Sequence, residues 1–333
     1  MTESITIIGG GLSGLSLAIA LRNHGLPVTL HEAGSYPRHR VCGEFISGIS
    51  PDTLERLGIS ETLTDALPHR SLSWFSGNRP LRRNTLSEPA LAISRHLLDD
   101  RLQQMAIRSG VDLQTRSRMK PQPGAPGLVW AAGRRPVKGN WIGLKAHIRG
   151  ITTTAELEMH SGPGGYLGIT PIEDGWSNAC GLFKIDSSIK TKHAALLPAY
   201  LEGNGNTDLA QRIRDAEWKE GSFTAVAGFG LGLQEPMPGV LALGDSHAII
   251  PPFTGNGMTM AFQSAEIALP HLIAFAEGKT PWPDTCKAIQ TSLHKAFRKR
   301  LTAAKLIHPL LFHPAALPIL SHAPMKPILH LIR

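Results

Sequence analysis

Cysteine and tyrosine are scarce in this chain, which has three of each among its 333 residues. Cys42, Cys180 and Cys286 lie far apart and form no Cys-x-x-Cys pair. A disulfide framework or a zinc site is therefore not expected, and the chain fits a reducing compartment. No group of histidines has metal-ligand spacing, so we predict no metal site. The first residues lack a basic stretch followed by an apolar core and a cleavage site, so we expect a cytoplasmic protein without a signal peptide.

Acidic residues are missing from the last part of the chain. Eight basic residues and no Asp or Glu follow position 284, namely Lys287, Lys295, Arg298, Lys299, Arg300, Lys305, Lys326 and Arg333. The residues before them carry both signs in equal number, so the net charge of +8 belongs to the tail. No basic stripe with interleaved aromatic residues is present, and nucleic acid is not an expected partner.

Long apolar runs are also missing. Residues 281–333 are predicted to be helical, but they are interrupted by Pro309, Pro314, Pro318, Pro324 and Pro327, which exclude a continuous membrane span. Between positions 294 and 308, apolar residues at helical spacing stand beside basic ones. This segment either contacts an anionic membrane or a lipid-like substrate, or caps the fold with a solvated basic face. The prolines favour the cap.

A glycine-rich motif begins close to the N-terminus. Ile5-Thr6-Ile7-Ile8 is typical of a buried strand and continues into Gly9-Gly10-Gly11-Leu12-Ser13-Gly14, a Gly-x-Gly-x-x-Gly turn. An amphipathic helix, a strand at 28–31 and Glu32 follow. In a βαβ unit, such glycines permit a tight turn, close approach to a pyrophosphate and tight helix packing, and the acid bonds an adenosine ribose. This order predicts a dinucleotide site; a purely structural turn is the alternative.

The rest of the chain divides by its hydrophobic period. Helices are predicted near 51–57, 95–109, 193–201, 208–216 and 257–276, and strands near 72–75, 81–86, 111–113, 128–132 and 240–243. Between Trp141 and Phe183 the period changes to two, which predicts an antiparallel sheet. A chain of this length holds two domains, or one with a large insertion.

A second glycine-rich motif follows the strand at 240–243. It reads Gly244-Asp245-Ser246-His247, then Pro251-Pro252-Phe253-Thr254-Gly255-Asn256-Gly257-Met258. Its acid stands at the end of a predicted strand, where ligands bind in open α/β sheets. Together with the N-terminal turn, this motif resembles the flavoprotein superfamily of para-hydroxybenzoate hydroxylase, the geranylgeranyl reductases and the flavin-dependent halogenases. The resemblance extends to about Ala276.

The resemblance implies FAD as the cofactor and assigns residues to its parts. The pyrophosphate would be held by Gly9, Gly11, Leu12, Ser13 and Gly14, and the adenosine ribose by Glu32 and Ala33. The ribityl chain would be held by Gly244 and Asp245. The pyrimidine edge of the flavin would lie against Pro252, Gly255, Asn256, Gly257 and Met258, where a helix N-terminus stabilises negative charge.

The loop from Arg40 to Ser47 resembles the Cys-Gly-x-x-Ile-Ser form of geranylgeranyl-reductase-like members. By that likeness Arg40 and Val41 approach the ribityl and phosphate region, and Cys42 borders the isoalloxazine ring. Arg95 matches a cofactor-contacting residue at a helix start; a solvated helix cap is the alternative.

One departure from the family concerns the electron donor. Many members carry Gly-Ala-Asp-Gly after the strand at 128–132, whereas this chain has Ala131-Ala132-Gly133-Arg134-Arg135 and no Asp. NADPH or NADH is the expected donor, but the resemblance implies that the acidic motif supports nicotinamide binding, and this chain lacks its Asp. Arg134 and Arg135 could hold its phosphates.

Three side chains are candidates for the chemistry. Lys145 and His147 alternate with apolar residues and share one face of a strand, so they could orient or protonate a substrate. A solvent-facing pair is the alternative. Cys42 could act near the flavin, or could be a small buried packing residue.

These observations predict an α/β fold. It would consist of a Rossmann-like FAD-binding domain of the glutathione-reductase type, an inserted antiparallel-sheet substrate domain and a helical C-terminus. We place the FAD-binding domain at 1–68, 92–139 and 222–280, the substrate domain at 69–91 and 140–221, and the helical basic segment at 281–333.

The expected function is that of a cytoplasmic FAD-dependent oxidoreductase, peripheral to the membrane if its tail binds lipid. A monooxygenase is favoured because that activity is commonest in the family; it would use reduced flavin and O2 on an apolar aromatic, polyketide or lipid-like molecule of secondary metabolism. The Cys-Gly-x-x-Ile-Ser loop instead favours a geranylgeranyl-reductase-like ene-reductase or desaturase. The Trp-x-Trp-x-Ile-Pro pattern of tryptophan halogenases is missing, so halogenation is not expected. A flavin- or lipid-binding protein without turnover is the non-enzymatic alternative, and the oligomeric state stays open.

Overall fold

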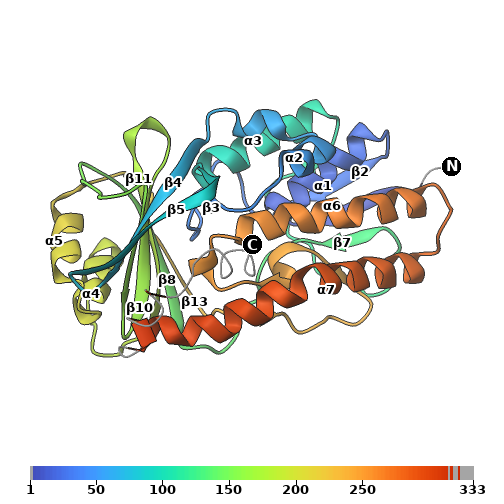
Figure 1. The fold of residues 1–333 in the computed structure, drawn as a ribbon. Coiled ribbons are helices and arrows are strands. Elements are labelled where there is room, and N and C mark those ends of the chain that lie inside the picture. Colours follow the sequence, from blue (N-terminus) through green and yellow to red (C-terminus); the bar gives the residue numbers. More distant parts are fainter. Residues whose placement is uncertain (1–2, 314–315, 318–321, 323–333) are drawn as a thin grey trace.

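The computed structural model of the protein describes residues 3–313, 316, 317 and 322. Two sheets lie side by side, and a long C-terminal helix runs along both of them (Figure 1). Several residues named above for the tail, Pro314, Pro318, Pro324, Lys326, Pro327 and Arg333, lie outside the described residues.

The first sheet is parallel and has the strand order β15-β7-β1-β2-β6. Its strands are β1 (Ile5–Ile8), β2 (Val28–His31), β6 (Asp112–Gln114), β7 (Leu128–Trp130) and β15 (Leu241–Ala242). Every pairing in it is parallel. The Rossmann-like core predicted from the sequence is therefore confirmed, and β15 completes it from a segment more than a hundred residues after β7.

Helices surround this sheet. They are α1 (Leu12–Asn23), α2 (Pro51–Leu57), α3 (Arg95–Arg108), α6 (Gly257–Ala276) and α7 (Trp282–Ile307). α1 contacts α2, α3 and α6, and α7 lies against α6. Local signals set several of their ends. The side chain of Ser50 caps α2 by accepting from Thr53 N at 3.1 Å, and Ser94 caps α3 by accepting from Leu97 N at 3.0 Å.

The second sheet is larger and mostly antiparallel, in the order β12-β8-β11-β10-β9-β4-β5-β3, with β13 also paired to β8. Its strands are β3 (Phe45–Ile46), β4 (Leu67–Ser76), β5 (Arg79–Ala92), β8 (Trp141–Arg149), β9 (Leu157–Gly162), β10 (Gly165–Pro171), β11 (Ser177–Lys184), β12 (Glu217–Trp218) and β13 (Thr224–Ala227). Only β4 and β9 pair in parallel. β4 and β5 are longer than the strands expected at 72–75 and 81–86, because the exposed arginines of β5 interrupt its apolar pattern.

Two helices, α4 (Leu196–Gly203) and α5 (Thr207–Asp215), cover one face of this sheet. Leu144, Ala146 and Ile148 of β8 form a buried cluster with Leu197 and Ile213 of these helices. Successive side chains of a strand point to opposite faces. The intervening residues of β8 therefore face the other way, toward the loop that follows β2.

Short elements complete the fold. They are the 3₁₀ turns η1 (Ser60–Leu63), η2 (Glu173–Gly175), η3 (His193–Ala195), η4 (Gly244–Ser246), η5 (Pro252–Thr254) and η6 (His308–Phe312), and a small ribbon of β14 (Gly232–Leu233) and β16 (Ala248–Ile249). The proposed domain boundaries stay a prediction. Two strands from segments assigned to the first domain, β3 and β13, pair in the larger sheet.

Candidate functional site

The glycine turn after β1 has the geometry that its motif predicts. Gly9 has φ +111°, and a Cβ there would stand 2.3 Å from Ala131 O. A Cβ at Gly14 would stand 2.0 Å from Gly9 O, whereas one at Gly11 would meet nothing within 4 Å. No side chain caps the start of α1. The turn is thus closed on the protein side and open at Gly11, beside a helix N-terminus, which fits a phosphate group.

Glu32 stands at the end of β2, next to this turn. Its carboxylate accepts hydrogen bonds from Gly10 N at 2.8 Å and Gly34 N at 2.7 Å and pairs with Arg38 Nη2 at 2.7 Å. Burial raises the pKa of Glu32, but the Gly34 amide and the Arg38 charge outweigh it and hold the pKa below its usual value. The Tyr36 hydroxyl donates to Gly10 O at 2.6 Å. The acid is placed as predicted for a ribose, but protein donors occupy its oxygens.

Two predicted cofactor arginines share one buried carboxylate, Asp99. Arg40 Nε donates to it at 2.8 Å, and Arg95 Nε and Nη2 donate at 2.7 and 2.8 Å. The Arg95 side chain is 12% exposed, so it is not the solvated helix cap offered as the alternative. Arg40 Nη2 is buried without a hydrogen-bond partner among the described residues, and the nearest carboxylate oxygen of Glu32 lies 3.9 Å away. An unpartnered guanidinium N–H close to the glycine turn fits an anionic cofactor.

The second glycine-rich motif folds against the first. Ser13 Oγ lies 2.8 Å from Ser264 Oγ on α6, and Ser264 Oγ also accepts from Gly244 N at 3.1 Å. A Cβ on Gly244 would stand 3.1 Å from Ser13 Cβ. Two stretches about 230 residues apart in the sequence therefore form one surface, as a shared dinucleotide requires.

Asp245 is the acid of this second motif. Asp245 is exposed, and it makes no hydrogen bond or ion pair within the part of the chain that the structure describes. Its oxygens are free for a ligand hydroxyl, which fits the predicted ribityl contact.

At the start of α6, in contrast to Asp245, the side chains make contacts within the protein. Asn256 is fully buried; its Nδ2 donates to Ser47 O at 2.8 Å and its Oδ1 accepts from Arg300 Nη1 at 2.8 Å. Met258 is buried in the core, and Gly255 has φ +63°. The helix has no side-chain cap. What this turn offers a ligand is therefore its backbone N–H groups, as the helix-dipole argument expected. Among the remaining predicted residues, Leu12 is buried in the core and Val41 is partly exposed. Pro252 and Ala33 are exposed.

The candidate catalytic residues Lys145 and His147 are fully buried, so the solvent-facing alternative is wrong. Both meet Glu44, whose carboxylate lies 3.2 Å from Lys145 Nζ and 2.6 Å from His147 Nε2 and accepts from Arg95 N at 2.9 Å. Glu44 itself is 0% exposed and has φ +53°. Burial raises the pKa of Glu44, but the His147 bond and the Lys145 charge lower it below its usual value.

Two further histidines extend this group outward. Lys145 Nζ donates to His39 Nδ1 at 3.2 Å, the ring of His39 meets that of His147 edge-on at 4.9 Å, and it stacks on His96 at 4.6 Å. We call Glu44, Lys145, His147, His39 and His96 the Glu44 cluster. Burial and the Lys145 charge lower the pKa of His39 to about 3, so this ring is neutral. Glu44, His39 and His96 were not predicted as site residues. The signal for Glu44 was present in the sequence: if Lys145 and His147 lie on a buried strand face, they require an anionic partner.

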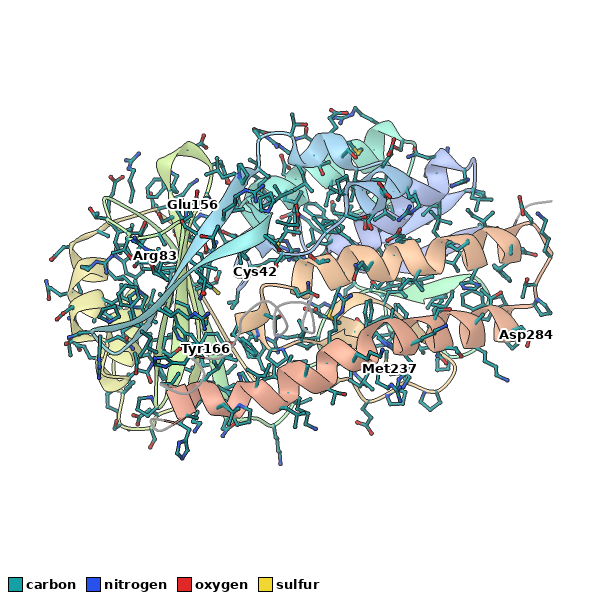
Figure 2. All side chains as sticks on the ribbon, in the orientation of Figure 1. Cys42, Arg83, Glu156, Tyr166, Met237 and Asp284 are labelled. Carbon is teal, nitrogen blue, oxygen red and sulfur yellow. The ribbon has the colours of Figure 1, made fainter. Side chains whose placement is uncertain are left out.

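Cys42 lies between the two sheets, near β3 (Figure 2). Its carbonyl accepts from Asn178 Nδ2 at 3.0 Å, and its sulfur accepts from Glu44 N at 3.4 Å. Burial raises the pKa of the Cys42 thiol, so the residue is a protonated thiol rather than a nucleophilic thiolate.

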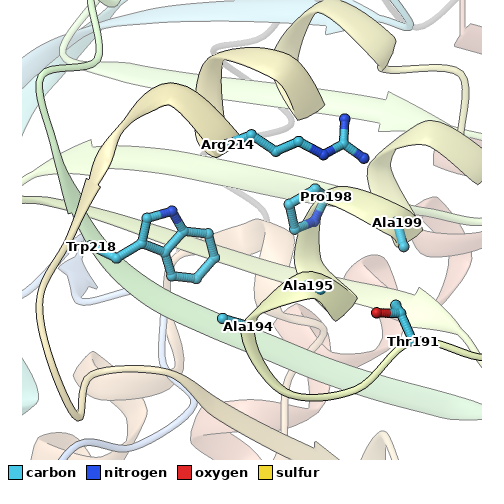
Figure 3. A pocket seen from close by; sticks show the side chains of 7 residues that line it. All are labelled: Thr191, Ala194, Ala195, Pro198, Ala199, Arg214 and Trp218. Atoms are coloured by element: carbon cyan, nitrogen blue, oxygen red, sulfur yellow. The ribbon is translucent and has the colours of Figure 1, made fainter.

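Arg134 and Arg135 do not stand free for a nicotinamide phosphate. Arg134 Nη1 donates to Gly228 O at 3.1 Å and lies over the ring of Phe229, and Arg135 donates to Glu235 O. Both guanidinium groups therefore hold the segment 228–235. An open pocket of about 490 Å³ lies at α4 and α5 (Figure 3), but none of its lining residues belongs to the glycine turns or the Glu44 cluster.

Two features are missing from the described residues. Among them, no group of three or more His, Cys, Asp or Glu side chains is arranged to hold a metal ion. None of the helices in that part of the chain has the length and apolarity needed to cross a membrane.

Comparison with known proteins agrees with this geometry. Residues 4–65 match the family model of the pyridine nucleotide-disulphide oxidoreductases. Menaquinone reductase of Mycobacterium tuberculosis (strain ATCC 25618 / H37Rv) is 24% identical over 98% of this chain and 88% of its own length. The menaquinone reductase of Mycolicibacterium smegmatis is 22% identical over 97% of this chain and 88% of its own.

Solved structures share the whole fold at low identity. A flavin-dependent brominase superposes with a TM-score of 0.77 at 18% identity, covering 99% of this chain and 92% of its own. A probable FAD-dependent monooxygenase from Pseudomonas aeruginosa gives 0.72 at 15% identity, covering 96% and 99%. A geranylgeranyl bacteriochlorophyll reductase-like protein from Thermoplasma acidophilum gives 0.73 at 17% identity, covering 99% and 95%.

These findings confirm the predicted fold: the solved structures share it over nearly the whole chain, and the family-model match at residues 4–65 covers its predicted dinucleotide-binding unit. The loops described above fit FAD through the open Gly11, the unpartnered Arg40 Nη2 and the free carboxylate of Asp245.

Proposed function

We propose that this protein is an FAD-dependent reductase of an apolar, lipid-like small molecule, and that the Glu44 cluster supplies the proton that the reduction requires. Bound FAD would supply the hydride, with NADPH or NADH as its electron donor. The hydride and one proton together add two hydrogens across the reduced bond, so the chain has to hold and deliver the proton.

The observation that carries this proposal is the Glu44–His147 pair. Glu44 holds His147 Nε2 at 2.6 Å, and His147 Nδ1 is buried without a hydrogen-bond partner in the described structure. A carboxylate that binds one ring nitrogen fixes the orientation of an imidazole and leaves the other nitrogen to exchange a proton. Asn178 Oδ1, on the strand opposite His147, is also buried and unpartnered. Two free polar atoms on the sheet face that meets Cys42 fit a polar group of a substrate.

The other members of the Glu44 cluster favour a proton supply. Lys145 is 0% exposed and contacts both Glu44 and His39. His39 and His96 are half-buried, stacked and outside the sealed pair. The hydrogen bond from Lys145 to His39 links the buried pair to these outer rings, which lie closer to solvent. The similarity to menaquinone reductases over nearly the whole chain also supports reduction of an apolar ring or chain.

A monooxygenase, which the sequence placed first, is the second candidate. Its support is the structural likeness to a probable FAD-dependent monooxygenase and to a flavin-dependent brominase. The two candidates differ in what enters the product: two hydrogens in one, an oxygen atom from O2 in the other.

The test uses the purified flavoprotein. The flavin is first reduced anaerobically with NADPH or NADH, and a short-chain menaquinone is then added in D2O, or together with ¹⁸O2. The reductase predicts flavin reoxidation without O2 and a product that gains deuterium. Gain of ¹⁸O would establish the monooxygenase instead, and a flavin that no donor bleaches and no substrate reoxidises would indicate a binding protein without turnover.

A matched pair of variants tests the assignment of the proton. His147→Gln should slow product formation at least about a hundredfold, because general acid catalysis contributes roughly 10²–10⁴ in rate, while flavin reduction by the donor stays unchanged. His160→Gln is the control, since His160 pairs with the buried Glu158 at 3.1 Å elsewhere in the same sheet. Equal slowing in both variants would mean that His147 is only structural.

A further inference from the structure

α7 buries one face and exposes another. Its apolar side chains Ile289, Leu293, Phe297 and Leu301 are buried at intervals of four residues. The exposed residues of its second half, apart from Ala296, are Lys295, Arg298, Lys299, Thr302, Lys305 and Leu306. Intervals of three and four residues place these side chains on one side of a helix. This exposed stripe is basic, and it contains no acidic residue because Asp284 is the last acid of the chain. The buried face packs against the fold, as the cap interpretation expects, and the basic face is exposed in the part of the chain that the structure describes.

The stripe ends in exposed leucines. Leu306 is 69% exposed and Leu310, in η6, is 41% exposed. The end of β11 lies beside them, because Lys184 Nζ stands 5.7 Å from the centre of the Phe312 ring, and Ile185 is 47% exposed. Asp186 is the acid next to this end, and its carboxylate accepts hydrogen bonds from Ser188. Exposed leucines rimmed by lysines are typical of a surface that contacts lipid.

Beneath these leucines lies an aromatic cluster that reaches the second glycine-rich motif. Phe312 stacks on Tyr166 at 5.9 Å, and His308 stacks on Phe253 of η5 at 6.0 Å. Phe253 N in turn donates to the Tyr166 hydroxyl at 3.0 Å. Figure 2 shows Tyr166 close to the C-terminal end of α7. One face of the segment 306–312 therefore contacts solvent and the other contacts the turn predicted to meet the flavin.

We propose that the exposed stripe of α7, with Leu306, Leu310 and the end of β11, docks on an anionic lipid bilayer. The charge of the stripe matches anionic headgroups, and the leucines match the acyl region below them. An apolar molecule leaving such a bilayer at η6 meets the aromatic cluster first, on the way to Phe253. This route rests on the proposed function, whereas the docking surface does not.

The experiment is flotation of the full-length flavoprotein with vesicles. Vesicles of neutral phosphatidylcholine are compared with vesicles containing about 30% phosphatidylglycerol, at roughly 50 mM and roughly 500 mM salt. We expect binding only to the anionic vesicles, and less of it at high salt. The variant Lys295→Gln/Lys299→Gln/Lys305→Gln should lower the partition coefficient roughly a hundredfold, because each basic residue near an anionic surface contributes about a factor of five.

Matched variants separate the surface from total charge and from apolar exposure. Arg116→Gln/Arg118→Gln/Lys120→Gln removes as many charges from exposed positions after β6 and should keep wild-type binding. Leu306→Ser/Leu310→Ser should weaken binding, whereas Ile107→Ser, at a 53% exposed position on α3, should not. The proposal is overturned if the wild-type protein fails to float, if both charge variants float alike, or if the stripe variants instead change self-association on a sizing column. Turnover of a soluble short-chain substrate without vesicles tests the proposed function separately.

Discussion

The two glycine-rich turns and the Glu44 cluster are both polar regions of the protein, but they are built differently. In the turns, backbone groups and partly exposed arginines surround Glu32, and Arg38 keeps 32% of its side chain exposed. In the Glu44 cluster, the central acid, the lysine and the histidine are all buried. The turns thus stay open on one side, as the proposed cofactor site requires, whereas the Glu44 cluster, the proposed proton source, has its central residues sealed from water. The three predictions below test this difference.

The largest effect is expected for Glu44→Gln. Lys145 would then be a buried charge without its anionic partner, and breaking such a pair costs about 3–5 kcal/mol. Urea unfolding followed by circular dichroism measures the loss. Glu32→Gln is the comparison and should cost about 1 kcal/mol, because Arg38 regains solvent. Equal losses would contradict the difference between the sites, and Glu44→Gln/Lys145→Met should recover part of the stability.

A smaller effect is expected when glycines of the N-terminal turn are replaced. Gly14→Ala places a Cβ against Gly9 O, so the backbone must shift, at about 1–3 kcal/mol of stability. Gly11→Ala should leave stability within about 0.5 kcal/mol but lower FAD affinity at least about tenfold, or about 1.4 kcal/mol. Unfolding curves and flavin titration measure the two quantities. If Gly11→Ala binds FAD normally, the open face of the turn is not where the cofactor lies.

The smallest effect is expected on the pH dependence of the free energy of unfolding. Burial and the charge of Lys145 lower the pKa of His39 to about 3, so below its usual 6.5 the unfolded chain binds a proton that the folded protein does not. Stability therefore falls as pH drops from 6.5, and His39→Gln should reduce that slope. The depressed pKa of Glu32 acts only below 4.5. Unfolding free energies at pH 7, 6 and 5 should thus change through His39 and the other histidines with lowered pKa values before Glu32 contributes. An unchanged slope in His39→Gln would contradict the share assigned to His39.

The sequence predicts the turns better than the Glu44 cluster, and the reason is distance along the chain. Gly9, Gly11, Gly14 and Glu32 lie within one βαβ unit, so local spacing is enough to place them. Glu44 meets His147 across 103 residues, and its partners depend on how one sheet packs on the loop of another.

At several positions the sequence does not show whether a side chain is buried, and burial decides its role. Lys145 and His147 gave the same alternating pattern whether the face was solvated or sealed, so the sequence left both interpretations open. Asn256 was predicted from its motif, but its use in holding Ser47 and Arg300 depends on α7. The buried face of α7, in contrast, followed directly from helical spacing.

The placement of β15 at the edge of the parallel sheet has a consequence for synthesis. β15 pairs with β7, and α6 packs on α1, yet both emerge from the ribosome only after the whole second sheet. The first half of the protein therefore waits, with the apolar side of α1 uncovered, until residue 276 has left the exit tunnel. A nascent chain stalled before that point therefore exposes this surface to chaperones.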